Sequence, residues 1–257
     1  MIIKNQLIGC RTILRKDMQR NLRVWRQSFI PPAISSILYF IIFGNLVGRN
    51  VGDLHGFTYS QFIAPGLIMM HLITNAYSNC SSSIFVAKLS HYIEEILVSP
   101  LTAFFILLGF MLGGIFRGMV VAGIVTVISF YFTHVHLYSL IIFLIVSFLT
   151  AMIFSLAGII NALFAKTFDD INVIPVFVLT PLIYLSGVFY SLHVLPHFWQ
   201  TVSLFNPLIY IVNSARYGYL GYHGTSVFVA ISILMLIAFG LFAFTYYLIK
   251  KGYGLVE

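Results

Sequence analysis

Charge is scarce in this 257-residue chain. Only 8% of the residues are charged, seven of them acidic, while 60% are hydrophobic. A soluble domain of this length needs a polar exterior, which this composition does not supply. The sequence therefore predicts an integral membrane protein.

Motifs for chemistry are missing as well. The chain has no Gly-x-x-x-x-Gly-Lys-Ser/Thr motif and not one Gly-Lys pair, so it carries no phosphate-binding loop. No Ser/His/Asp set, paired catalytic carboxylates or Cys/His cluster emerges, and the pairs His134/His136 and His193/His197 lack a reliable metal-ligand geometry. We expect a chain that is not an enzyme, binds no metal or cofactor itself and leaves any ATP to another protein.

Long apolar stretches dominate what is present, and six of them reach the roughly 20 residues that a spanning helix needs. They cover residues 28–48, 62–83, 104–132, 138–164, 171–190 and 226–249. The predicted fold is an all-α membrane protein with six transmembrane helices in one domain, 1–257. It comprises an interfacial helix at 1–27, five spans within 28–190, a re-entrant outer region at 191–225 and the sixth span at 226–249.

The basic residues predict the orientation, because Lys and Arg accumulate in short loops on the cytoplasmic side. Eleven of the fourteen fall on one side, Arg49 and Arg216 on the other, and Arg117 within a span. The eleven are Lys4, Arg11, Arg15, Lys16, Arg20, Arg23, Arg26, Lys88, Lys166, Lys250 and Lys251. We therefore expect both termini in the cytoplasm, and a net charge of +7 that meets anionic lipid headgroups rather than nucleic acid. Cys10 and Cys80 fall on the same side, where a disulfide is unexpected.

Residues 5–27 have the pattern of a helix lying on the membrane surface. One stripe of this helix is apolar and the other face carries the basic residues. The apolar stripe consists of Leu7, Leu14, Met18, Leu22 and Trp25.

The segment KLSHYIEEILVSP, residues 88–100, is the only sizeable charged stretch between two long apolar spans. On a helical wheel the two sides separate, as in a short helix lying flat on a membrane, and Pro100 ends it. Phe85, Leu89, Tyr92, Ile93, Ile96 and Leu97 form the apolar side; Lys88, His91, Glu94 and Glu95 form the polar side. The segment is either a cytoplasmic contact surface or an interfacial cover for the loop.

A second short loop, residues 165–170, falls on the same side of the membrane. Lys166, Asp169 and Asp170 either form a second docking point or cap the helix that begins there.

Polar residues within the spans should face other helices or a pathway, because lipid does not satisfy them. His71 and Asn75 are such residues in the second span, with interhelical hydrogen bonding or ligand contact as the two possible roles. Arg117 either lines a pathway or pairs structurally, since an isolated charge at this depth is costly. Gly109 with Gly113, and Gly114 with Gly118, give two small-xxx-small faces that permit close helix approach.

Residues 187–224 are too apolar and aromatic for a solvated loop and are predicted to dip back into the membrane as a cap over an exit route. The sequence predicts two short helices here, one beginning near Pro196 and one with Asn206 as N-cap and Pro207 in the first helical position. Trp199, Tyr210 and Arg216 belong to this cap. Its aromatic residues either stack on sugar or lipid headgroups or form an interfacial belt.

Several of these segments together resemble the membrane subunit of ABC-2-type exporters, over nearly the whole chain. They are FIAPGLIMM at 62–70, IEEILVSP at 93–100, AKTFDDI at 165–171, GVFYSLHVLP at 187–196, and NPLIY at 206–210 with Arg216. An acidic pair followed by proline, combined with Asn-Pro before a late aromatic-rich helix, is typical of that family.

The resemblance implies a coupling helix at 85–98, with Glu94 and Glu95 meeting a separate ATPase, and re-entrant helices before the sixth span. It also implies a homodimer that docks two copies of that ATPase, which uses ATP and Mg²⁺, in a bacterial inner membrane. The expected function is export of a lipid-linked, glycan-like or amphipathic cargo. The alternatives are an ATP-independent channel or secondary carrier, and a scaffold that recruits a cytoplasmic protein.

Overall fold

A computed structural model describes residues 2–48, 52–54, 56–135, 137–191, 196–222, 224 and 226–255. Within these ranges every named element is a helix. Arg49, His136 and His193, which entered the orientation and metal arguments, lie outside the described residues.

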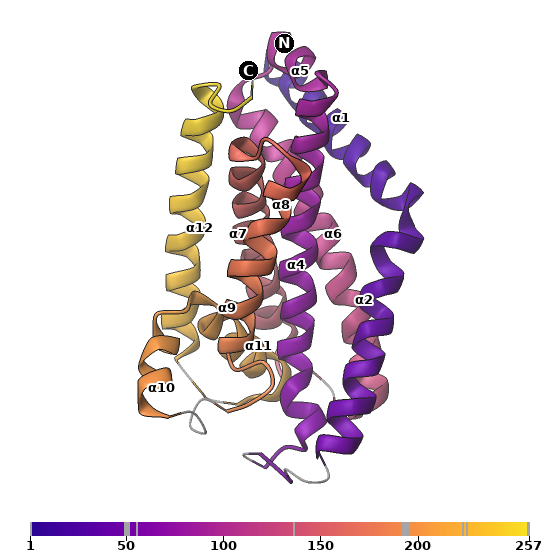
Figure 1. Ribbon diagram of the computed structural model, residues 1–257, viewed down its shortest axis with the longest axis vertical. Coiled ribbons are helices and arrows are strands. Elements are labelled where there is room, and N and C mark those ends of the chain that lie inside the picture. The colour runs from indigo at the N-terminus through magenta and orange to yellow at the C-terminus, as the bar shows by residue number, and fades with distance from the viewer. Residues whose placement is uncertain are drawn as a thin grey trace.

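The chain begins with α1 (Ile2–Arg23), followed by α2 (Trp25–Tyr39), which continues as the π-helical segment η1 (Phe40–Val47). Val24 separates α1 from α2 with non-helical dihedrals, and the two helices meet there at an elbow in Figure 1. α1 runs obliquely along the bundle; of its predicted apolar stripe, Leu7 and Leu22 are exposed, whereas Leu14 and Met18 are half-buried. This orientation is the one expected of a helix lying at a membrane surface.

Three long helices form the centre of the bundle: α4 (Tyr59–Leu89), α6 (Ala103–Thr133) and α7 (Leu140–Phe164). Glycines bring them together, because a Cβ atom at Gly114 would meet Cys80 and Ser155, and one at Gly158 would meet the Tyr77 carbonyl. The other small-residue face of α6, Gly109 and Gly113, lies against α1.

Among the described residues, five helices are long and apolar enough to cross a membrane. They are residues 25–44, 103–133, 140–164, 168–185 and 227–250. α4 is not among them, although its 31 residues exceed the required length, because its polar residues lower its hydropathy. α4 lies among the long helices in Figure 1 and is the one with the most buried residues.

The predicted helix over 85–98 is wrong as a single element. Phe85, Lys88 and Leu89 belong to the end of α4, the chain turns at Ser90 and His91, and the short helix α5 covers only Tyr92–Val98. His91 has a left-handed conformation with φ of 55°, which stops the preceding helix. Leu89, predicted on the apolar side, is 62% exposed as a result.

The second half of the chain contains α8 (Phe168–Ile174), which continues through η2 (Pro175–Leu179) into α9 (Thr180–Leu185). A turn at Gly187, with φ of 74°, follows. The short helices α10 (His197–Leu204) and α11 (Pro207–Leu220) precede the long α12 (Val227–Lys250). Both short helices begin where the sequence predicts them to begin.

The two ends of the molecule differ in content (Figure 1). Both termini and α5 lie at one end, which we call the α5 end, whereas α9, α10 and α11 gather at the other, the α11 end. Every predicted contact with a cytoplasmic partner therefore has to be sought at the α5 end.

Candidate functional site

α5 is seated on the α5 end by one apolar face and exposes its acids. Ile93 and Ile96 are buried, whereas Glu94 and Glu95 are exposed in the first helical turn. Nδ1 of His91 lies 2.9 Å from Oε1 of Glu94. The amphipathic pattern predicted for the loop thus holds from residue 92 onward, and it presents two carboxylates to the outside.

The amino end of α1 holds the segment that follows α5. Buried Gln6 donates from Nε2 to the Pro100 carbonyl at 2.5 Å and accepts at Oε1 from the Thr102 amide at 2.8 Å. Pro100 therefore contributes its carbonyl to this contact while its ring stays exposed. These two bonds fix α1 to the start of α6.

α1 also contacts α5 directly. The ammonium of Lys16 lies 3.1 Å from the centre of the Tyr92 ring, a cation–π contact. Burial, with the Arg20 charge as the next cause, lowers the pKa of Lys16. Burial, followed by the charge of Glu95, raises the pKa of Tyr92. Both shifts indicate that this contact is partly withdrawn from water.

Lys88 joins the end of α4 to the end of α7. Its ammonium donates to the carbonyls of Ala162, Leu163 and Ala165 at 3.0 to 3.2 Å. These carbonyls belong to the carboxyl end of α7, where helical carbonyls lack intrahelical partners and a cation is favourable. Lys88, predicted to couple to a partner protein, thus caps a neighbouring helix.

In the loop after α7, Asp170 caps α8 from its third position. Its Oδ2 accepts from the amides of Lys166 and Thr167, each at 2.9 Å, while the Asp170 amide donates to Oγ1 of Thr167 at 3.2 Å. Thr167 is the N-cap residue itself, and the pair forms a capping box. The capping alternative therefore describes Asp170, whereas Lys166 and Asp169 remain exposed at the α5 end.

A groove of about 660 Å³ opens between these elements. Its walls come from the end of α4, from His91 and Glu94 at α5, from residues 163–166, and from the C-terminal residues 253–255. Lys88, His91, Glu94 and Lys166 line it; Glu95, Pro100, Asp169 and Asp170 do not.

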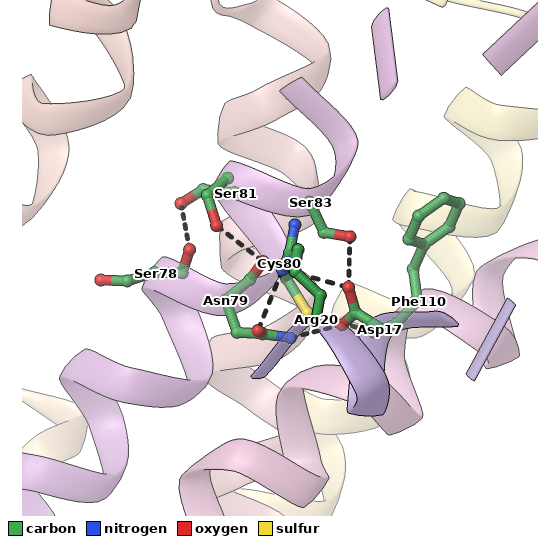
Figure 2. A network of polar contacts seen from close by, with 9 residues as sticks. Asp17, Arg20, Ser78, Asn79, Cys80, Ser81, Ser83 and Phe110 are labelled. Carbon is green, nitrogen blue, oxygen red and sulfur yellow. Dashed lines mark hydrogen bonds and ion pairs between the residues drawn. The ribbon is translucent and has the colours of Figure 1, made fainter. Parts of the chain in front are cut away.

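Beneath α5, Asp17 forms the centre of a buried polar network that the sequence did not reveal (Figure 2). Its carboxylate accepts from Nδ2 of Asn79 and from Oγ of Ser83, both at 2.6 Å, and pairs with Arg20 at 3.0 Å. Arg20 in turn donates to Oδ1 of Asn79 at 3.1 Å. Asp17 is 4% exposed, so this carboxylate depends on its protein partners.

Arg117 of α6 lies within reach of this network. A Cβ atom on Gly113, one turn earlier, would meet the Asp17 carboxylate, but the described residues show no ion pair between Arg117 and Asp17. The Nε atom of Arg117 is buried and has no hydrogen-bond partner among the described residues. The structure thus places an acid near Arg117 without pairing the two and leaves Nε unsatisfied.

His71 and Asn75 lie two turns and one turn before Asn79 on the same face of α4, and both are buried. Asn75 donates from Nδ2 to the His71 carbonyl at 2.9 Å, a bond within the helix. Nε2 of His71 has no partner within the described part of the chain. The predicted interhelical bond from this face is found at Asn79, one turn further on.

At the α11 end, Arg216 of α11 holds that helix and the turn at Gly187 to α4. Its Nε donates to the Phe62 carbonyl at 3.2 Å, its Nη2 donates to the carbonyls of Gly187 and Val188, and its guanidinium lies 3.8 Å from the Phe62 ring centre. Asn206 is the predicted N-cap: it accepts from the Leu208 amide at 3.0 Å and donates to the Leu182 carbonyl at 2.7 Å. Pro207 occupies the first helical position.

The aromatic residues of α10 and α11 divide by exposure. Trp199 on α10 is 44% exposed. Phe198 and Phe205 are more exposed than Trp199. Tyr210 is half-buried and donates to the Leu204 carbonyl at 3.3 Å, which ties α11 to α10. The exposed rings therefore lie on α10 and at its carboxyl end.

Comparison with known proteins decides the family. The model of the ABC-2 type transporter family matches residues 9–220. The chain belongs to the ABC-2 type transporter family. It is 47% identical to the inner membrane transport permease YadH of Escherichia coli K12 over 96% of this chain and 97% of that protein. It is also 25% identical to nodulation protein J of Rhizobium leguminosarum bv. viciae, over 83% of this chain and 87% of that protein.

Membership establishes a membrane transport permease with several apolar helices, similar to an inner membrane protein. ABC-2 permeases are membrane subunits of ABC transporters that work with an ATPase. No group of three or more His, Cys, Asp or Glu that could hold a metal ion occurs in the described ranges. Cys10 and Cys80 are free and buried, and burial raises the pKa of the Cys10 thiol.

For this ABC-2 permease, sequence reasoning missed Asp17, Gln6 and the C-terminal wall of the groove. Asp17 had one signal, as the single acid in a strongly basic amino-terminal helix. Gln6 had none, because its partners lie 94 and 96 residues away.

Proposed function

We propose that the chain is the permease half of an ATP-driven exporter, with six spans when α4 is included and with both termini in the cytoplasm. The observation that carries this proposal is the composition of the α5 end. There, exposed acids on α5, exposed Lys166 and Asp169, and both termini share one surface. A soluble ATPase needs such a polar platform, because the adjoining helices present apolar side chains.

The orientation is supported by the basic residues on the same end of the bundle. Arg11 and Arg15 on α1, Lys166 in the 165–170 loop and Lys251 after α12 are all exposed. Positive charge near the ends of spans favours the cytoplasmic side. The name of the relative YadH supports an inner membrane location.

Force from the ATPase would enter at α5 and leave through α4. α5 is connected to α4 by only two residues, contacts α1 through Tyr92 and Lys16, and is fixed by two buried isoleucines. α4 packs against both α6 and α7 along glycine contacts. A push on α5 therefore displaces the central helices rather than a loose loop.

Two identical chains and two ATPase copies complete the proposed exporter. The spans that begin at Trp25, Phe168 and Val227 have only 17% of their most apolar window buried, against 56% in α6. Their outward faces are apolar and suit lipid or a second chain. A lipid-linked, glycan-like or amphipathic cargo fits a permease whose re-entrant end exposes Phe198, Trp199 and Phe205.

Purification in mild detergent tests the proposal. The tagged chain is expected to elute with an ATPase, identified by its sequence and by ATP hydrolysis. The double variant Glu94→Lys/Glu95→Lys should lose that ATPase. Asp53 is an exposed acid before the amino end of α4, the end opposite to α5, so Asp53→Lys should keep the ATPase. A chain that elutes alone and supports flux without ATP would be a channel or carrier. One that binds a non-hydrolysing protein and supports no flux would be a scaffold.

Orientation has a separate test, because both native cysteines are buried. Ser90→Cys at the α5 end should react with a membrane-impermeant maleimide only after the membrane is opened. Tyr138→Cys, at an exposed position beyond the far end of α6, should react in intact cells. The reverse pattern would place the termini outside.

A further inference from the structure

The C-terminal residues fold back onto the bundle after α12 ends. The Gly252 amide donates to the Ile249 carbonyl at 3.0 Å, and the Tyr253 amide donates to the Leu248 carbonyl at 3.1 Å. These two bonds close a turn. Leu255 is only 5% exposed, and a Cβ atom on Gly254 would meet the Leu163 carbonyl of α7. We call residues 252–255 the C-terminal turn. Its position is fixed by packing.

The C-terminal turn forms one wall of the groove at the α5 end. Segments that are distant in sequence converge there: the end of α4, the start of α5, residues 163–166 and residues 253–255. The ring of Tyr253 lies 5.3 Å from that of Phe164, centre to centre. The return of the chain to α7 after α12 therefore supplies one of the walls of the groove.

The lining of the groove mixes apolar side chains with charged side chains of both signs. Leu89, Phe164 and Tyr253 are each more than half exposed. Glu94 and Lys166 line the same groove. Apolar side chains gathered in a hollow and bordered by polar groups are typical of protein–protein contact sites. Anionic lipid is less suitable, because Glu94 lies in the groove beside the cations.

We propose that the C-terminal turn is a third docking element for the ATPase, beside α5 and the 165–170 loop. This inference rests on the proposed function. The partner surface must offer an aromatic or aliphatic side chain for the groove, a basic group for Glu94 and an acidic group for Lys166. Tyr253 is the anchor on the permease side, since exposed aromatic rings in pockets carry a large share of binding energy.

The test measures the affinity of the purified chain for the ATPase that co-purifies with the unaltered chain. Tyr253→Ser should weaken binding about tenfold or more. Tyr131→Ser is the matched control, because Tyr131 is 76% exposed near the far end of α6 and lies outside the groove. It should bind as the unaltered chain does. Leu89→Ser, a change at the wall that α4 contributes, should weaken binding as well.

The outcomes separate this inference from the proposed function. If Tyr253→Ser and Leu89→Ser bind normally while Glu94→Lys/Glu95→Lys does not, α5 docks the ATPase without the groove and the inference is wrong. If the unaltered chain binds no ATPase, the proposed function fails first. A Tyr253→Cys variant that cross-links to a second permease, or a groove that retains lipid in the purified complex, would overturn the inference too. Equal unfolding temperatures for the variants exclude misfolding as the cause.

Discussion

Two arginines fasten helices to α4, one at each end of the molecule, and they do so by different chemistry. Arg20 joins α1 to α4 beside an acid, with Asp17 at 3.0 Å and Asn79 at 3.1 Å. Arg216 joins α11 to α4 through carbonyls and an aromatic ring; none of the acids that the structure describes lies within ion-pair distance of it.

This difference predicts which groups are left without a partner when one member of each contact is removed. Loss of Asp17 leaves cations without compensation, whereas loss of Arg216 leaves neutral carbonyls. The α5 end should therefore be the more sensitive to a single change, although its arginine is the more exposed of the two.

The largest expected effect follows from Asp17→Asn. The amide cannot balance Arg20 and Arg117, so the free energy of unfolding should fall by about 3 kcal/mol, the lower part of the range for broken buried pairs. Thermal unfolding in detergent measures the loss. Asp169→Asn is the control, since this acid is exposed, and it should unfold like the unaltered chain. A double variant, Asp17→Asn/Arg20→Gln, should lose less than Asp17→Asn alone. A larger loss would contradict the charge argument.

The corresponding change at the other end is Arg216→Met, which should cost about 2 kcal/mol because the carbonyls that it served lose charged hydrogen bonds. The effect should be local. Hydrogen exchange of residues 187–191 and 207–222 should rise, while exchange within α1 stays unchanged. Arg216→Lys should recover only part of the stability that Arg216→Met loses, because one ammonium cannot reproduce the guanidinium geometry. Full recovery would show that charge alone holds α11.

Glycine substitutions sharpen the comparison without changing charge. A Cβ on Gly113 meets the Asp17 carboxylate, which Asn79, Ser83 and Arg20 hold in place, so Gly113→Ala should cost about 1 to 3 kcal/mol. A Cβ on Gly66 would lie 3.0 Å from the backbone of Val188, so Gly66→Ala should cost less than Gly113→Ala. Gly123→Ala meets nothing within 4 Å and should gain up to about 1 kcal/mol from helix propensity. Equal behaviour of the three in thermal unfolding would contradict the packing assigned to α1.

The smallest expected effect concerns two lysines of the α5 end. Lys88→Met removes the cation at the end of α7 and should lower the free energy of unfolding by about 1 kcal/mol. Lys166→Met alters an exposed side chain and should stay within about 0.5 kcal/mol. The same thermal assay distinguishes them. If Lys166→Met were the more destabilising, the roles assigned to the two lysines would be reversed.

Local signals in the sequence located much of the fold. Asn206-Pro207 predicted a helix start that the structure shows, because N-cap chemistry depends on adjacent residues. The apolar stretches predicted the long helices, and the acids of residues 94 and 95 were placed on an exposed face. The break at His91 was missed, since neither glycine nor proline marks it.

The site depended on contacts that no local pattern encodes. The partners of Asp17 on α4 lie 62 and 66 residues away, and those of Arg216 lie 28 to 154 residues away. Lys88 was predicted as an exposed charge, because the sequence does not show that the end of α7 lies beside it. Burial of polar groups is decided by which helices meet, and therefore by the packing of the whole bundle.

α4 contacts both arginine anchors and is uninterrupted between its Thr58 cap and Leu89. At 1.5 Å per residue its 31 residues make a rod about 45 Å long. A tilt of about 5° moves one tip of such a rod by about 4 Å relative to the other. Arg216 of α11 holds the rod at Phe62, and α5 follows directly after its opposite tip. A change in the tilt of α4 would therefore move α5 and the Arg216 contact relative to each other.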